Sequence, residues 1–175
     1  MQGMEIVVNA LDSNNGLLQM ALKDLGEEDL HRNPNKDSNH IAWLLWHQTR
    51  TEDNLIALCS SAPPLWGADG WHAKFGMDAD PKISGLGEPI DQAVAFRAPS
   101  LATLMEYAAA VRAQTKTYLS KVTEADLNRE APSPRDGSMA KISHYLGIML
   151  VDHIQHTGQI AYLRGLNDGF GWLPF

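Results

Sequence analysis

Three histidines and one aspartate have the residue types and the spacing of a metal site. In the segment 151–159, Asp152 and His156 lie four residues apart, and His153 and His156 lie three apart. If this segment is helical, either spacing places both side chains on one face. Imidazole and carboxylate groups are ordinary ligands of zinc and related divalent metals. One helix would therefore supply half of a metal site.

The missing ligand is expected from a second helix, and His47 is the best candidate. It stands in the apolar stretch 43–50, where a buried imidazole would need a polar partner. Asp152 and His153 are competing candidates for one position, because adjacent helical residues point about 100° apart and cannot aim equally at one metal. Buried histidines bonded to each other or to the backbone are the alternative to a metal site.

Four further residues are candidates for supporting or substrate-contacting roles. Arg50 and Asp53, three and six residues after His47, can pair with each other on the surface or orient a ligand. Gln159, three residues after His156, can hydrogen-bond near the site, and Trp71 can cover an apolar part of a substrate. The other histidines are expected at surface or packing positions: His31, His40, His72 and His144.

Length and composition restrict the class of protein. The 175 residues are enough for one domain, taken as 1–175, with a substantial core. The net charge of −7 argues against a nucleic-acid-binding protein, which normally carries a basic patch. The single cysteine, Cys59, excludes an internal disulfide, and no apolar run approaches the ~20 residues of a membrane span. With no basic, apolar leader at the amino terminus, the sequence predicts a cytoplasmic protein without membrane partners.

Apolar spacing predicts four long helices and no strands, hence an all-α four-helix bundle. The helices are expected over about 4–25, 38–59, 100–121 and 141–165, and the predicted N-caps are Ser38 or Asn39, Ser100 and Ser138. Residues 25–32 and 122–129 resemble each other, and each follows a long helix, which suggests two helix–turn–helix halves. The glycine-rich segment 65–99 carries Trp66, Trp71 and Phe75 and is predicted to be a packed flap. The aromatic tail, 167–175, is expected to fold back onto the bundle.

Three segments in this order resemble the DinB-like superfamily, and most closely its mycothiol-dependent transferases and isomerases. They are Trp-Leu-Leu-Trp-His-x-Thr-Arg-x-x-Asp (43–53), Ala-Asp-Gly-Trp-x-x-x-Phe-Gly (68–76) and Gln-His-x-Gly-Gln-x-Ala-Tyr-x-Arg-Gly (155–165). The resemblance implies a four-helix bundle with a divalent metal, commonly zinc or nickel. It also implies one histidine ligand in the second helix and two ligands four residues apart in the fourth. These positions correspond to His47, Asp152 and His156, and His153 remains the rival of Asp152.

The function expected from this resemblance is that of a metal-dependent thiol S-transferase in detoxification. The metal would activate a low-molecular-weight thiol of the mycothiol or bacillithiol type for attack on a small electrophile. The alternatives are a metal-dependent hydrolase or isomerase and a non-catalytic metal- or ligand-binding stress protein. A di-iron protein is disfavoured because only one helix offers a suitable ligand pair. A homodimer is plausible, since many small bundles pair.

Overall fold

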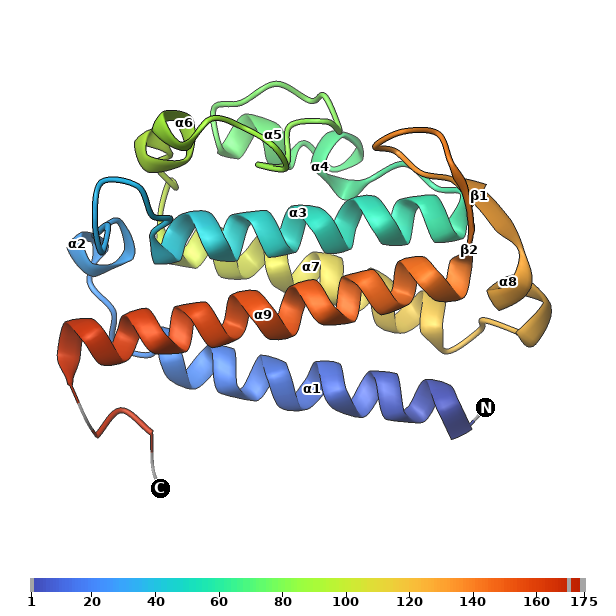
Figure 1. The fold of residues 1–175 in the computed structure, drawn as a ribbon, viewed down its shortest axis with the longest axis horizontal. Coiled ribbons are helices and arrows are strands. Elements are labelled where there is room, and N and C mark those ends of the chain that lie inside the picture. The colour runs from blue at the N-terminus through green and yellow to red at the C-terminus, as the bar shows by residue number, and fades with distance from the viewer. Residues whose placement is uncertain (1, 170, 174–175) are drawn as a thin grey trace.

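The computed structural model describes residues 2–169 and 171–173, and its framework is a bundle of four long helices (Figure 1). These are α1 (Gln2–Leu22), α3 (Ile41–Ser60), α7 (Leu101–Leu119) and α9 (Ile142–Asp168). The helix α9 packs against both α3 and α1, and α7 packs against α3. The predicted all-α four-helix bundle is therefore confirmed.

The relative directions of α3 and α7 explain why the connection between them is long. These two helices run the same way, so the chain must travel back along the bundle between them (Figure 1). The connection contains three short helices, α4 (Leu65–Ala68), α5 (Trp71–Lys74) and α6 (Ile90–Ala95). Trp66, Trp71 and Phe75 are all buried, so the connection is a packed layer on the bundle, as the sequence suggested. We call residues 61–100 the flap.

The two short helices α2 (Glu27–Leu30) and α8 (Glu124–Asn128) occupy the two segments of the internal repeat. A small antiparallel hairpin, β1 (Glu130–Pro132) and β2 (Met139–Lys141), follows α8 and was not predicted. Strands of three residues are too short to show an alternating pattern. The hairpin includes the chain up to Lys141, so α9 begins at Ile142 and the predicted cap at Ser138 is wrong.

A histidine, and not Ser38 or Asn39, caps the amino terminus of α3. The Nδ1 atom of His40 accepts a hydrogen bond from the backbone N–H of Trp43 (3.2 Å), and Nε2 donates to the carbonyl of Phe96 (3.1 Å). His40 is fully buried, which corrects its expected surface position. Ser100 caps α7 as predicted, accepting from the N–H of Thr103.

The bundle interior has two apolar ends and a polar middle. One apolar cluster includes Leu45 and Leu163 with the flap aromatics, and the other includes Ile56 and Met149. Along α3, α7 and α9, the residues between these clusters are polar and buried or half-buried: Gln48, Glu52, Arg112, Thr115, His153 and Thr157. The candidate metal-site residues occur at this polar level.

The aromatic tail was predicted to fold back onto the bundle, and the structure describes one of its three aromatic residues, Trp172. Trp172 packs against the first apolar cluster, with its indole nitrogen 3.8 Å from the Cβ position of Gly165. The other two tail aromatics, Phe170 and Phe175, lie outside the described residues. Among the described helices, none combines the length and the apolar character that a membrane crossing requires.

Candidate metal centre

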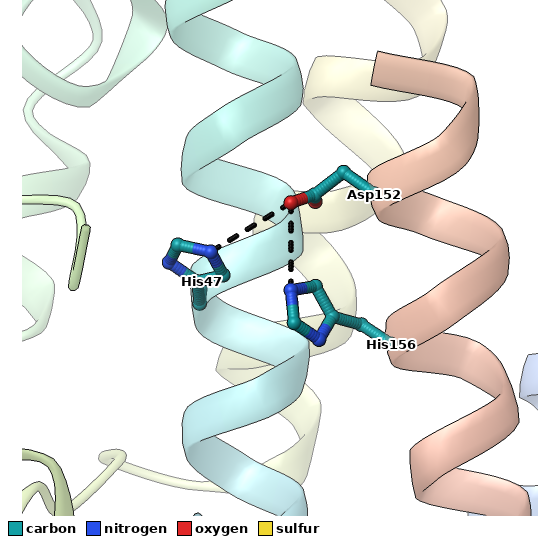
Figure 2. Close-up of side chains that lie close together, drawn as sticks. All are labelled: His47, Asp152 and His156. Carbon is teal, nitrogen blue, oxygen red and sulfur yellow. Dashed lines mark ion pairs between the residues drawn. The ribbon is translucent and has the colours of Figure 1, made fainter. Parts of the chain in front are cut away.

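His47 of α3 and Asp152 and His156 of α9 converge on one point between the two helices (Figure 2). Their potential ligand atoms all lie within 4.8 Å of one another. Asp152 Oδ1 is 3.7 Å from Nε2 of His47 and 3.4 Å from Nε2 of His156. The two imidazole rings are nearly perpendicular, with centroids 5.0 Å apart. We call these three residues the His–Asp–His group.

Each imidazole of the group is held through its other nitrogen. His47 Nδ1 donates to the backbone carbonyl of Ser84 (2.5 Å), and His156 Nδ1 donates to the side-chain oxygen of Gln159 (2.7 Å). A histidine that donates from Nδ1 carries its free lone pair on Nε2. Both Nε2 atoms therefore face the carboxylate between them and are the nitrogens available to a metal, as in protein metal sites where an outer hydrogen bond orients the ring.

The spacing of the donor atoms suits a small divalent cation. Ligands about 2.0–2.1 Å from a tetrahedral zinc lie roughly 3.4 Å apart, close to the 3.4 and 3.7 Å found here. Asp152 Oδ2 is buried and has no hydrogen-bond partner among the described atoms. A buried carboxylate oxygen without a partner is costly. The group can therefore bind a metal ion, with two nitrogens and one or two oxygens.

The electrostatics of the two histidines differ. Burial lowers the pKa of His47 and outweighs the opposing effects of Ser84 and Asp152. Burial also acts to lower the pKa of His156, but the contacts with Asp152 and Gln159 outweigh it and raise the pKa overall. Burial therefore favours the neutral form of His47, whereas the contacts with Asp152 and Gln159 favour the protonated form of His156.

His153 does not join the group, although the sequence made it the rival of Asp152. Its Nε2 atom lies 2.9 Å from Glu52 Oε2 inside the bundle, and Arg112 Nη2 contacts both the same carboxylate oxygen (2.9 Å) and His153 Nδ1 (3.5 Å). The physical reason is the rotation of about 100° per helical residue: when Asp152 faces the α3–α9 groove, His153 faces the core. Glu52 and Arg112 were not singled out from the sequence, where no spacing signal connects them to His153.

The flap holds His47 from the side opposite Asp152. The Ser84 carbonyl belongs to the flap. Trp43, which lies one turn before His47 in α3, stacks its indole on the imidazole, with centroids 4.7 Å apart and planes 6° apart. Trp43 Nε1 in turn donates to Glu88 of the flap (2.5 Å). Gly85 has φ +82°, and a Cβ there would lie 2.7 Å from Trp43 Cζ2 and 3.0 Å from His47 Nδ1. Sequence reasoning missed these contacts because a backbone carbonyl 37 residues away leaves no residue-type signal.

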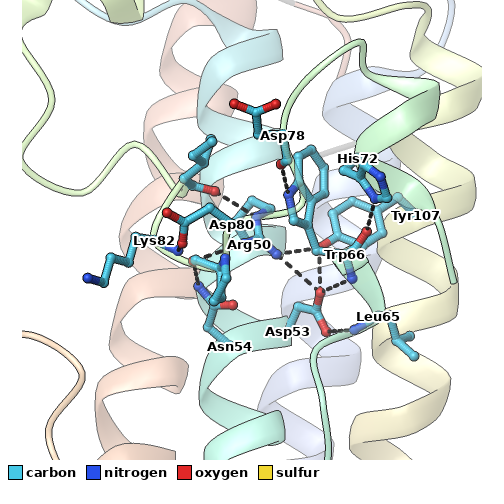
Figure 3. Close-up of polar contacts among 12 residues, drawn as sticks. Arg50, Asp53, Asn54, Leu65, Trp66, His72, Asp78, Asp80, Lys82 and Tyr107 are labelled. Atoms are coloured by element: carbon cyan, nitrogen blue, oxygen red, sulfur yellow. Dashed lines mark hydrogen bonds and ion pairs between the residues drawn. The ribbon is translucent and has the colours of Figure 1, made fainter. Parts of the chain in front are cut away.

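Arg50 and Asp53 form a buried ion pair that fastens the flap to α3, and not a surface pair (Figure 3). Arg50 donates to the carbonyls of Pro81 (3.1 Å) and Ile83 (3.0 Å), close to Ser84. Asp53 accepts from the backbone N–H groups of Leu65 and Trp66, both at 2.8 Å, at the start of the flap. Tyr107 of α7 bonds to both members of the pair. The pair thus attaches two parts of the flap to α3: residues 65–66 at its start, and residues 81–83, which directly precede Ser84.

The two remaining candidates lie in different surroundings. The indole of Trp71 is buried against Tyr107, with centroids 5.2 Å apart, in the aromatic cluster around Trp66. Gln159 both bonds to His156 and lines a cleft of about 780 Å³. The cleft lies between α9 and the chain before α3; its lining includes Asn39, Leu44, Ile90, Gln155 and Tyr162. This volume is in the range of small-molecule sites.

Comparison with known proteins agrees with the fold. None of the curated proteins matched the chain. Among solved structures, the crystal structure of a conserved protein from Enterococcus faecalis superposes with a TM-score of 0.83 at 23% sequence identity, covering 95% of this chain and 97% of that one. The family model of the DinB superfamily matches residues 10–160, a span that includes His47, Asp152 and His156. This chain therefore belongs to the DinB superfamily.

Proposed function

We propose that this protein is a divalent-metal-dependent S-transferase that uses a low-molecular-weight thiol to detoxify small electrophiles. The observation that carries the proposal is the convergence of two imidazoles and a carboxylate. Gln159, which hydrogen-bonds to His156, lines a cleft large enough for a small molecule. The thiol is expected to be of the mycothiol or bacillithiol type, by resemblance to the thiol-dependent members of the superfamily. A reducing compartment such as the cytoplasm, where such thiols are kept reduced, is the expected location.

Zinc or nickel is the expected metal, because two imidazole nitrogens and a carboxylate oxygen suit either ion. When bound, a divalent cation stabilises the deprotonated form of a thiol or water, which makes a nucleophile available near neutral pH. The chain contributes the orientation of its ligands through Ser84 and Gln159. It contributes substrate binding through the cleft that Gln159 lines.

The chain's own thiol is unsuited to the nucleophilic role, which supports an external thiol. Cys59 is the only cysteine, and burial raises its pKa to about 11. A thiol with that pKa is almost entirely protonated at pH 7 and therefore a poor nucleophile. It also packs in the second apolar cluster, with Ile56 and Met149.

A metal-dependent hydrolase or isomerase is the second candidate, and the free oxygen of Asp152 favours it. Asp152 Oδ2 has no hydrogen-bond partner among the described atoms and can accept a proton from a water molecule in the group. In that case turnover would not depend on an added thiol. A non-catalytic binding protein would hold the metal and show no turnover with either class of substrate.

The test combines metal analysis with turnover. Purified wild-type protein should hold about one zinc or nickel per chain, as expected for one three-ligand site. His47→Ala, Asp152→Ala and His156→Ala should each lose the metal while keeping their helical circular dichroism. His153→Ala is the matched control and should retain the metal, since that side chain faces Glu52. Conjugation of an electrophile such as a chloronitrobenzene should require both metal and thiol.

The outcomes separate the candidates. Full metal occupancy in His47→Ala and His156→Ala would refute the site. Metal-dependent turnover of an ester or amide without thiol would favour the hydrolase. Metal binding with no turnover of the conjugation or hydrolysis substrates would favour the third candidate, a non-catalytic binding protein.

A further inference from the structure

Gln159 of α9 is shared by the His–Asp–His group and the cleft, and its side-chain amide has one end for each. Its Oε1 atom accepts the hydrogen bond of His156 Nδ1 (2.7 Å). The residue is exposed and lines the cleft of about 780 Å³. Among the described residues, none hydrogen-bonds to its Nε2 atom. The amide nitrogen is therefore the polar group that Gln159 offers to a molecule in the cleft.

The tautomer of His156 determines which end of the amide faces the cleft. With a metal on Nε2, the imidazole carries its only proton on Nδ1, so Gln159 must turn its oxygen to His156 and its NH2 group to the cleft. In the metal-free protein, Nε2 can instead keep the proton and share it with Asp152, whose Oδ1 is 3.4 Å away. Nδ1 then accepts a hydrogen bond from the NH2 group, which leaves the amide oxygen for the cleft.

We propose that Gln159 couples the cleft to the metal group: its oxygen orients His156, while its NH2 group donates to an oxygen atom of an uncharged, hydroxyl-bearing molecule in the cleft. A bound metal fixes the amide in the orientation that this molecule needs, so the molecule binds more tightly to the metal-loaded protein. Coupling between two binding sites is reciprocal, so the molecule raises the metal affinity by the same factor. The proposal rests on the metal site of the proposed function and not on its thiol chemistry.

The residues around the cleft identify the ligand as uncharged. Among the described residues that line it there is no lysine, arginine or histidine, and the one formal charge is that of Asp37. An anion would meet no cation there, in a chain whose net charge is −7. Asp37 is exposed and already lies 4.0 Å from Lys36 Nζ, so it provides no buried counter-charge for a cationic ligand.

The remaining residues around the cleft suit hydroxyl groups on a partly apolar molecule. Amide and hydroxyl side chains both donate and accept hydrogen bonds, as hydroxyl groups of a ligand do. The cleft has six such side chains: Asn35, Ser38, Asn39, Gln155, Gln159 and Tyr162. Leu44, Ile90 and Leu163 add apolar surface for a carbon skeleton.

The test measures binding of phenyl β-glucoside by ligand-observed NMR, and binding of zinc by competition with a chromophoric chelator. The glucoside joins an apolar ring to uncharged hydroxyls, and phenyl β-glucuronide is its matched anion, with a carboxylate in place of one hydroxymethyl group. Zinc should tighten glucoside binding at least about twofold, the factor for an amide orientation that is half populated without metal. The glucoside should raise zinc affinity by the same factor. The glucuronide should bind at least about tenfold more weakly than the glucoside.

Substitutions of Gln159 distinguish coupling from a merely structural role. Gln159→Glu keeps an oxygen for His156 and adds a charge, so zinc affinity should be retained or rise. It offers the cleft no donor, so glucoside affinity should fall at least about tenfold and no longer depend on zinc. Gln159→Met removes both contacts and should also lower zinc affinity, by about 10–100-fold. Gln19→Glu is the matched control: Gln19 is exposed on α1, outside the cleft, and this variant should behave as wild type.

Four results would overturn the proposal. They are no glucoside binding at about 10 mM, equal glucoside affinity with and without zinc, a glucuronide that binds as tightly as the glucoside, and a Gln159→Glu variant that loses zinc as Gln159→Met does. Wild-type protein that binds no zinc would refute the metal site itself and the coupling with it. Wild-type protein that binds zinc and conjugates an electrophile, but shows no coupling, would refute only the role of Gln159. The two failures therefore give different results.

Discussion

Replacing Gly85 by alanine should weaken metal binding without touching a ligand. At φ +82°, an alanine costs about 1–2 kcal/mol in backbone strain. Its Cβ would also lie 2.7 Å from Trp43 Cζ2 and 3.1 Å from Trp46 Cζ3. Since carbon atoms prefer separations of about 3.5 Å or more, the flap backbone must retreat by roughly 0.8 Å.

That retreat acts on the hydrogen bond that orients His47. The Ser84 carbonyl, one residue away, is 2.5 Å from His47 Nδ1, and a movement of about 0.8 Å would stretch this bond beyond the usual 3.2 Å. Loss of an outer hydrogen bond to a metal-binding histidine typically lowers metal affinity by about 10–100-fold. We expect a loss of that size for Gly85→Ala, together with a fall of about 2–3 kcal/mol in the free energy of unfolding.

The assay is zinc affinity by competition with a chromophoric chelator, alongside urea denaturation of the metal-free protein. Gly87→Ala is the matched control, because Gly87 also has a positive φ (+75°) but no described atom within 4 Å of its Cβ position. It should lose stability through backbone strain and keep its zinc affinity. Equal zinc affinities for the two variants would refute the idea that the flap positions His47.

Two further predictions concern stability. Asp53→Asn should lower the free energy of unfolding in urea by about 3 kcal/mol, because it leaves the Arg50 guanidinium buried without its carboxylate; a loss no larger than that of the exposed control Glu106→Gln would contradict this role. Burial lowers the pKa of His40 from 6.5 to about 4, so the folded protein binds fewer protons than the unfolded chain between those pH values. Stability should therefore fall by roughly 1–2 kcal/mol from pH 7.5 to pH 5, and the slope should be smaller in His40→Asn, which keeps a capping side chain; an unchanged slope would exclude His40 as its source.

Much of the framework follows from local sequence. Apolar residues at helical spacing predict the four long helices, because each amphipathic segment has one face to bury. The spacing of Asp152 and His156 places both on one face in any regular helix. The apolar surroundings of His47 indicate that its imidazole needs a polar partner. The hairpin at 130–141 and the His40 cap escaped prediction, since both depend on contacts with other segments.

Only the tertiary structure decides whether Asp152 or His153 faces the candidate metal site. Sequence spacing allows either residue to face the metal, and only the rotation of α9 about its axis decides between them. That rotation is set by packing: Glu52 and Arg112 hold His153 inside the bundle, which directs Asp152 to the groove. Likewise, Ser84 reaches His47 only because Arg50 and Asp53 fasten the flap to α3. Local spacing determines which side chains share a helix face, whereas contacts between distant segments determine where that face points.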